Sequence, residues 1–201
     1  MSAVKIIDLS KGERLYDFEE SDSIIITGIT ESTLNDSITL AESAREAGAV
    51  TIGIPAGNDD IKRFADIADA VIFSHNESET SRGIAEEISD RDGDIFDIST
   101  MRAIFRNAGT VHYGTGSDDD MESALRKAAE MCGDIHGAKT AFVKMSLPPS
   151  EKGFDEVRII KDVLKEFCGD DVSTCFSNIL IGDGKITAKI FALMYDAGYT
   201  S

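Results

Sequence analysis

Residues 23–54, SIIITGITESTLNDSITLAESAREAGAVTIGI, decide the fold of this chain. The stretch begins with the β-branched run Ser23–Thr27 and ends with Val50–Ile54, and such continuous apolar runs are typical of strands covered on both faces. Between them, apolar and small residues recur at helical spacing over Asp36–Ala47, and Gly48 supplies a helix stop. The stretch therefore predicts a β-α-β unit of a parallel sheet with a right-handed crossover.

The same alternation continues on both sides of this stretch. A helical pattern covers Asp59–Ala68, the apolar run Ala70–Ser74 predicts another strand, and Val4–Leu9 predicts one more. We therefore expect residues 1–78 to form an α/β unit around a parallel sheet. Residues 79–108 read as connecting helices.

The remainder, residues 109–201, has a different rhythm. Its predicted elements are a short strand at Val111–Gly114, a helix through Cys132, an alternating strand at Lys139–Leu147, a helix at Phe154–Cys168, and strands at Val172–Ile181 and Lys185–Tyr195. The segment Gly182-Asp183-Gly184 predicts a tight turn joining the last two strands. Half-exposed strands with one layer of helices indicate an α+β domain.

Composition excludes several classes of function. The 201 residues include 37 acidic and 20 basic ones, a formal net charge of −17. Nucleic-acid and anionic-membrane binding need clustered Lys and Arg, which this chain lacks. No apolar run approaches the roughly 18 residues of a membrane span, and MSAVKIIDLS shows no signal peptide. We therefore expect a cytoplasmic protein.

Few residues have the spacing of a catalytic or metal site. The three cysteines form no C-x-x-C pair and are predicted to be buried free thiols, and the three histidines have no ligand at metal-binding spacing, so no metal is expected. In Ser117-Asp118-Asp119-Asp120 we expect Ser117 to be the N-cap of the following helix, the alternative being a metal site. Gly114-Thr115-Gly116 looks like part of a phosphate loop, but a tight strand–helix turn explains it better.

A series of short segments runs in a fixed order from Asp22 to the C-terminus. It comprises Asp22–Gly28, Ala44–Ile54, Asp69–Asn76, Gly83–Glu86, Asp97, Met101-Arg102, Gly109, Gly114–Gly116, Ala128-Ala129, Gly137–Lys139, Phe154–Val157 and Gly182. In this order the segments resemble the FtsZ/tubulin superfamily, and FtsZ in particular. The resemblance implies a shortened Rossmann-like nucleotide domain of the tubulin/FtsZ type, truncated at its N-terminus, followed by an FtsZ C-terminal-type α+β domain.

The departures from the family pattern bear on function. The family's glycine-rich signature loop corresponds here to Ile29–Asn35, which has no glycine and carries Glu31. Backbone N–H groups approach a phosphate closely only where side chains are absent. Of the family's catalytic-loop pattern, Ile95, Asp97 and Thr100 occupy the three positions, so that Asp97 is the only carboxylate retained. We therefore expect no catalytic site and no bound GTP or GDP, and Asp97 is better explained as a helix cap.

Two functions follow from this comparison. The first is a non-GTPase relative of FtsZ that acts by protein–protein interaction in cell division or cytoskeletal regulation, with FtsZ or a second copy of itself as the partner. The alternative is a small-ligand or nucleotide-binding protein that uses the carboxyl ends of the parallel strands, where Gly28, Gly57 and Asn76 are the candidate binding residues. A chain that only self-associates, as a homodimer covering an exposed apolar patch, is a third possibility.

Overall fold

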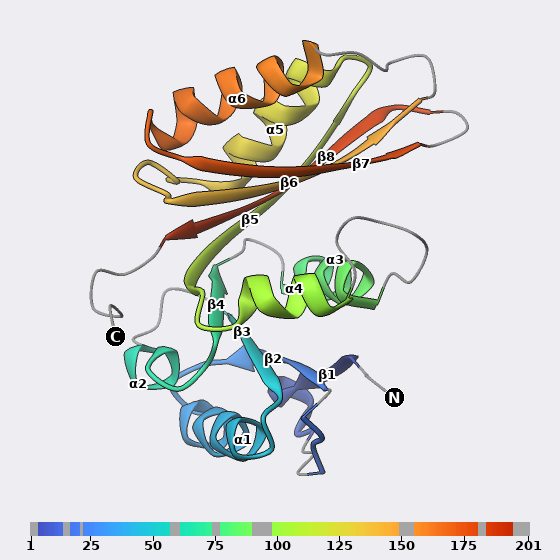
Figure 1. Cartoon of the computed structure of the whole chain (residues 1–201). Helices are drawn as coiled ribbons and strands as arrows, with labels where there is room; N and C mark the ends of the chain where they lie inside the picture. Colours follow the sequence, from blue (N-terminus) through green and yellow to red (C-terminus); the bar gives the residue numbers. More distant parts are fainter. Residues whose placement is uncertain are drawn as a thin grey trace. The chain divides into compact units, whose positions relative to one another are not determined.

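The computed structural model describes residues 4–13, 17–20, 22–56, 61–73, 77–89, 98–148, 155–180 and 184–194. The chain divides into two compact units, Met1–Thr110 and Val111–Ser201. Figure 1 shows the helices and strands of both units.

The first unit is built on a parallel sheet. Its strands, in sheet order, are β1 (Val4–Asp8), β2 (Ser23–Ile29), β3 (Val50–Pro55) and β4 (Ala70–Phe73). The helices are η1 (Leu9–Lys11), α1 (Leu34–Glu46), α2 (Lys62–Ala65), α3 (Glu77–Ser89) and α4 (Ile98–Phe105). Helices α1 and α2 cover one face of the sheet, and α3 and α4 cover the other (Figure 1).

Burial on both faces explains the continuous apolar strands. Every residue of β2 and β3 is buried. Ile24 and Ile26 belong to the core that includes α1 and α2, and Ile25, between them, points to the opposite face and is also fully buried. The predicted parallel sheet is confirmed, including the strand at Val4–Leu9, which is β1.

The helix predicted at Asp59–Ala68 is shorter than expected. In the described residues it spans only α2, Lys62–Ala65. Its last turn tightens, because the Ile67 amide donates to the Phe64 carbonyl at 3.0 Å, and the chain then returns to the sheet where the Asp69 amide donates to Thr51.

The second unit is an α+β sandwich, as predicted. Its elements are β5 (Gly109–Asp118, which begins at the end of the first unit), α5 (Met121–Cys132), β6 (Thr140–Leu147), α6 (Asp155–Cys168), β7 (Ser173–Leu180) and β8 (Ile186–Met194). The strand order is β5-β8-β6-β7, and α5 and α6 lie side by side on one face of the sheet (Figure 1).

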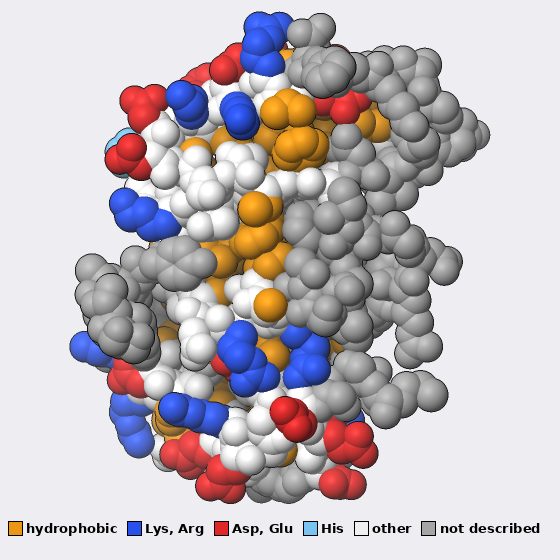
Figure 2. Space-filling view, in the orientation of Figure 1, with side chains coloured by type: hydrophobic (Ala, Val, Ile, Leu, Met, Phe, Trp, Pro, Cys, Tyr) orange, Lys and Arg blue, Asp and Glu red, His pale blue; other side chains and the backbone are white. Residues whose placement is uncertain are grey.

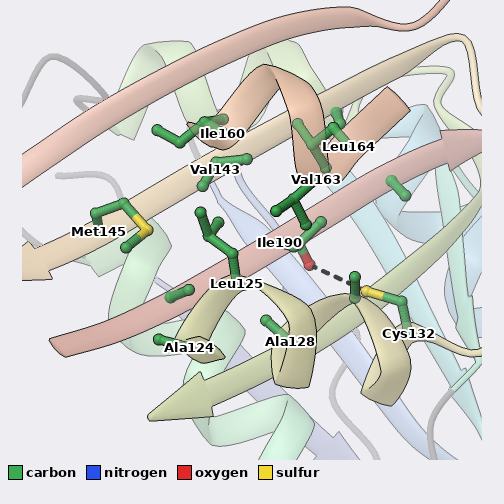
Figure 3. Close-up of a cluster of buried hydrophobic side chains, with 14 of the residues drawn as sticks. Ala124, Leu125, Ala128, Cys132, Val143, Met145, Ile160, Val163, Leu164 and Ile190 are labelled. Atoms are coloured by element: carbon green, nitrogen blue, oxygen red, sulfur yellow. Dashed lines mark hydrogen bonds between the residues drawn. The ribbon is translucent and has the colours of Figure 1, made fainter. Parts of the chain in front are cut away.

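Figure 3 shows the core between these helices and the sheet. The labelled side chains are Ala124, Leu125, Ala128, Cys132, Val143, Met145, Ile160, Val163, Leu164 and Ile190. The alternation predicted for β6 is confirmed for Ala141, Val143, Met145 and Leu147, which are all buried, but Lys144, predicted on the other face, is buried as well.

Two of the three cysteines are buried, as predicted. Burial raises the pKa of the Cys132 thiol well above its ordinary value and that of Cys168 to about 11, so both remain thiols at neutral pH. The prediction is wrong for Cys175, which is exposed. Its position on β7 faces away from the layer formed by α5 and α6.

The prediction that a tight turn pairs the last two strands is wrong. Strand β6 lies between β7 and β8, parallel to the first and antiparallel to the second. Because β7 and β8 are not neighbours, the segment between them is not a two-residue hairpin turn, and its residues 181–183 lie outside the described residues. Local turn residues do not reveal a third strand inserted between two that follow one another in sequence.

The N-cap of α5 is Asp120 and not Ser117. The Asp120 carboxylate accepts a hydrogen bond from the Ser123 amide at 2.9 Å. Ser117 lies inside β5, which continues to Asp118, and its hydroxyl contacts the Thr187 hydroxyl of β8 at 2.8 Å. Ser117 therefore belongs to the strand, where its hydroxyl pairs with Thr187 of β8, and the helix begins after Asp120.

Candidate functional site

The carboxyl ends of β1 and β2 bring three residues together from distant parts of the sequence. Asp8 ends β1, Gly28 lies near the end of β2, and Glu77 begins α3. Parallel sheets bind ligands at this edge, where loops leave the strands. We therefore treat this cluster as the candidate site.

The Gly28 amide donates to a carboxylate of the chain itself. It bonds Glu77 Oε1 at 3.3 Å, across a separation of 49 residues. The pKa of Glu77 is raised, mainly because the carboxyl group is partly buried. The hydrogen bond from Gly28 lowers this pKa, and the negative charge of Asp8 raises it further. A backbone donor at the carboxyl end of β2 is thus already occupied by an acidic side chain.

Gly28 itself is required by close packing. Its φ is +67°, and a Cβ on it would lie 2.7 Å from the Ser10 amide nitrogen and 3.2 Å from Asp8 Oδ1. Only glycine adopts this conformation without strain and leaves room for the chain that follows β1. These contacts give Gly28 a structural role at the same position where the sequence suggested a binding role.

The loop after β1 is closed by its own carboxylates. Asp8 accepts hydrogen bonds from the Ser10 amide at 3.0 Å and the Ser10 hydroxyl at 2.6 Å, and it pairs with Lys11 at 2.8 Å. The hydrogen bonds from Lys11 and Ser10 lower the pKa of Asp8. The Asp8 amide in turn donates to Glu13 at 2.8 Å. The amides of Asp8 and Ser10 therefore both donate hydrogen bonds to carboxylates of the chain itself.

The loop Ile29–Asn35, for which the sequence predicts a correspondence to the glycine-rich signature, is closed by threonine hydroxyls. The Thr30 amide donates to Thr33 Oγ1 at 2.9 Å, and that hydroxyl donates to the Gly28 carbonyl at 2.7 Å. The Thr33 amide completes the turn on the Thr30 carbonyl at 3.1 Å. Glu31 is exposed on this turn, where it adds negative charge.

Only Gly28 of this cluster is predicted from the sequence, and Asp8 and Glu77 are not. Asp8 lies near the end of the predicted strand Val4–Leu9, and Glu77 closely follows the predicted strand Ala70–Ser74. The rule that parallel strands place their carboxyl ends at one edge would therefore have indicated both. The other predicted positions, Gly57, Asn76 and Asp97, lie outside the described residues.

The glycines of Gly114-Thr115-Gly116 are not in a turn, which corrects the sequence interpretation. Both lie within β5 and face α5. A Cβ on Gly114 would lie 2.0 Å from the Ala128 carbonyl oxygen, and one on Gly116 would lie 2.3 Å from that of Ala124. Their spacing of two residues puts both on one face of the strand, where the helix backbone packs directly against it.

No metal-ligand cluster forms within the part of the chain that the structure describes, where no three His, Cys, Asp or Glu side chains converge. Asp118 pairs with Lys127, whose hydrogen bond is the largest cause of the lowered pKa of Asp118, and Asp120 caps α5. In the described ranges, no helix combines the length and the apolar character needed to cross a bilayer.

Replacing Glu77 by Gln tests the electrostatics of the cluster. Because the folded-state pKa of Glu77 is raised, the native state holds this proton more tightly than the unfolded chain. Wild type should therefore lose stability relative to Glu77→Gln as the pH rises above the ordinary pKa of a glutamate, about 4.3, and the two should converge at the acidic end. Gln retains an oxygen that can accept from Gly28.

Urea unfolding at several pH values measures this difference. Glu42→Gln, on the exposed face of α1, is the control for loss of one negative charge. A Glu77→Gln difference that stays constant with pH, or a wild type that gains stability relative to it, would contradict the assignment.

The comparisons with known proteins place this fold. No family model matches the chain, and no curated protein matches its sequence. Among solved structures, an empty FtsZ dimer from M. jannaschii matches with a TM-score of 0.62 at 12% identity, covering 88% of this chain and 64% of that one. GDP-bound CetZ1 from Haloferax volcanii matches with a TM-score of 0.60 at 16% identity, covering 89% and 66%.

A third solved structure belongs to the same group. TubZ from Bacillus thuringiensis, in GDP-form protofilaments, matches with a TM-score of 0.60 at 13% identity, covering 85% of this chain and 61% of that one. The chain thus spans less than two thirds of the length of these structures. It has the FtsZ/tubulin-like fold, which confirms the resemblance inferred from its sequence.

Proposed function

We propose that this chain is an FtsZ/tubulin-like protein that acts through protein–protein contacts, in cytoskeletal assembly or its regulation, and does not hydrolyse GTP. The observation that carries the proposal is the hydrogen bond from the Gly28 amide to Glu77. It lies at the sheet edge where α/β folds bind ligands.

Phosphate binding at this edge would have to displace the chain's own acidic groups. Binding sites for phosphate use backbone N–H groups that point at the ligand. Here the amides of Asp8, Ser10 and Gly28 bond to carboxylates of Glu13, Asp8 and Glu77. A phosphate would also meet the negative charge of those carboxylates, which repels it. This arrangement favours a function without nucleotide.

The solved structures of similar fold support a role in assembly. They include an FtsZ dimer, TubZ protofilaments and a two-stranded TubZ filament. From these we infer that the chain associates with itself or with a filament of FtsZ type, in cell division or a related cytoskeletal process. The net charge of −17 suits a protein that stays dispersed until it meets a specific partner.

The alternative function, a small-ligand site at the strand ends, has weaker support. Two of its three candidate residues, Gly57 and Asn76, lie outside the described residues. The third, Gly28, already donates to Glu77. No contact in the described residues favours this alternative over the first proposal.

Sedimentation tests the proposed assembly. We expect purified protein to form a dimer or larger species at micromolar concentration, or to co-pellet with filaments of M. jannaschii FtsZ, to the same extent with and without GTP. A chain that remains monomeric and changes neither the amount nor the turnover of FtsZ filaments would contradict the proposal. Assembly that requires GTP would contradict its nucleotide-independent part.

A further inference from the structure

Strand β7 ends the sheet of the second unit and leaves one edge open. It pairs with β6 over eight residues, and within the described ranges no strand lies on its other side. The Ser173 amide donates to the Lys139 carbonyl at 2.9 Å, which fixes the direction of the backbone groups. In a parallel pair these groups alternate, so Ser173 and Cys175 bond toward β6 while Thr174 and Phe176 direct their N–H and C=O groups outward.

A cationic hollow lies beside this edge. A cavity of about 280 Å³ is lined by Lys161 and Lys165 of α6 and by Val172 and Thr174 next to and on β7. The two lysines are one helical turn apart and both are exposed. Figure 2 shows basic side chains over α6 with acidic ones among them, and the two lysines that line the hollow belong to a chain whose acidic residues outnumber its basic ones by 37 to 20.

We propose that the open edge of β7 binds an acidic, extended segment of a partner protein as an added strand. The outward backbone groups of Thr174 and Phe176 hydrogen-bond to the main chain of that segment. The ammonium groups of Lys161 and Lys165 pair with acidic side chains at alternate positions of the segment. Backbone pairing provides the affinity, and the two lysines select for negative charge.

Charge decides between this occupant and a second copy of the chain. Two β7 edges that paired across a two-fold axis would bring both copies' Lys161 and Lys165 to the same seam, where like charges repel. Asp170 lies 3.8 Å from Lys165 and is highly exposed, so it compensates the charge of that lysine only weakly. This binding edge is separate from the Gly28 cluster and does not depend on the function proposed above.

Fluorescence anisotropy with a synthetic probe tests the proposal. The probe is a fluorescein-labelled peptide of alternating Val and Glu residues, as long as β7, and its counterpart has Lys in place of Glu. The acidic peptide should bind, and the basic one should bind at least about tenfold more weakly. Lys161→Glu combined with Lys165→Glu should weaken binding of the acidic peptide by about the same factor.

Thr174→Pro tests the backbone contribution separately. It removes an outward N–H, and proline is tolerated at such a position of an edge strand. We expect it to weaken binding about tenfold while the circular dichroism spectrum stays that of the wild type. The charge-matched control, Lys185→Glu with Arg45→Glu, changes exposed residues elsewhere and should leave binding unchanged.

Three results would overturn the proposal. The first is no binding of the acidic peptide. The second is binding that is lost in the lysine double variant but unaffected by Thr174→Pro, which would indicate simple anion attraction at the hollow. The third is a dimer in sedimentation that Thr174→Pro dissociates, which would make a second copy the occupant of the edge.

Discussion

Gly114→Ala and Gly116→Ala should each destabilise the second unit by about 3 kcal/mol, at the upper end of the cost of overpacking. A Cβ at either position would meet the backbone of α5, at 2.0 Å for Ala128 O and 2.3 Å for Ala124 O. Backbone atoms cannot rotate away as a side chain does, so the helix itself must move. That movement disrupts the core that α5 shares with β8 and α6.

Hydrogen exchange measured by mass spectrometry resolves this effect in β5 and α5. Gly12→Ala is the control for backbone strain alone, because Gly12 is in the left-handed helical conformation (φ +71°, ψ +20°) and has nothing within 4 Å of an added Cβ. It should cost only that strain, about 1 kcal/mol. If Gly114→Ala and Gly116→Ala cost no more than this control, the close packing of α5 on β5 is wrong.

Phe64→Ala should destabilise the first unit by about 3–5 kcal/mol, because it removes a fully buried aromatic side chain. Phe64 comes from the four-residue helix α2 and lies over Gly53 of β3, where an added Cβ would be 2.1 Å from Phe64 Cε1. The missing side chain of Gly53 is therefore what allows the ring to pack against the sheet.

A double-mutant cycle tests this pairing. Gly53→Ala should be strongly destabilising alone but should cost little in the Phe64→Ala background, which gives a coupling energy of about 1–3 kcal/mol. Urea unfolding measures the free energy of unfolding of the wild type, the two single variants and the double variant. Two effects that add without coupling would mean that the ring does not occupy the space above Gly53.

The elements that the sequence predicts best are those whose buried residues recur at a regular spacing along the chain. Strands β2 and β3 are buried on both faces, so they read as continuous apolar runs. In strand β6 the buried Ala141 and Val143 alternate with the half-buried Thr140 and Phe142, although Lys144, on the same face as those two, is also buried. The spacing of apolar residues is enough to predict these strands, because side chains alternate between the two faces and each face keeps the same surroundings along the strand.

The features that the sequence does not predict depend on contacts between distant residues. Nothing local to Gly182 indicates that β6 lies between β7 and β8. The i, i+2 spacing of Gly114 and Gly116 fits a turn as well as a helix-packing strand until α5 is placed against them. The contact from Gly28 to Glu77 spans 49 residues, so no motif contains both partners.

The central claim is that the carboxyl ends of β1 and β2 do not hold a nucleotide phosphate. Titration calorimetry with GTP and GDP tests it most directly. We predict no saturable heat at nucleotide concentrations up to about 1 mM, and no release of phosphate from GTP. One-to-one binding of GTP or GDP at micromolar concentration, with or without GTP hydrolysis, would contradict the account.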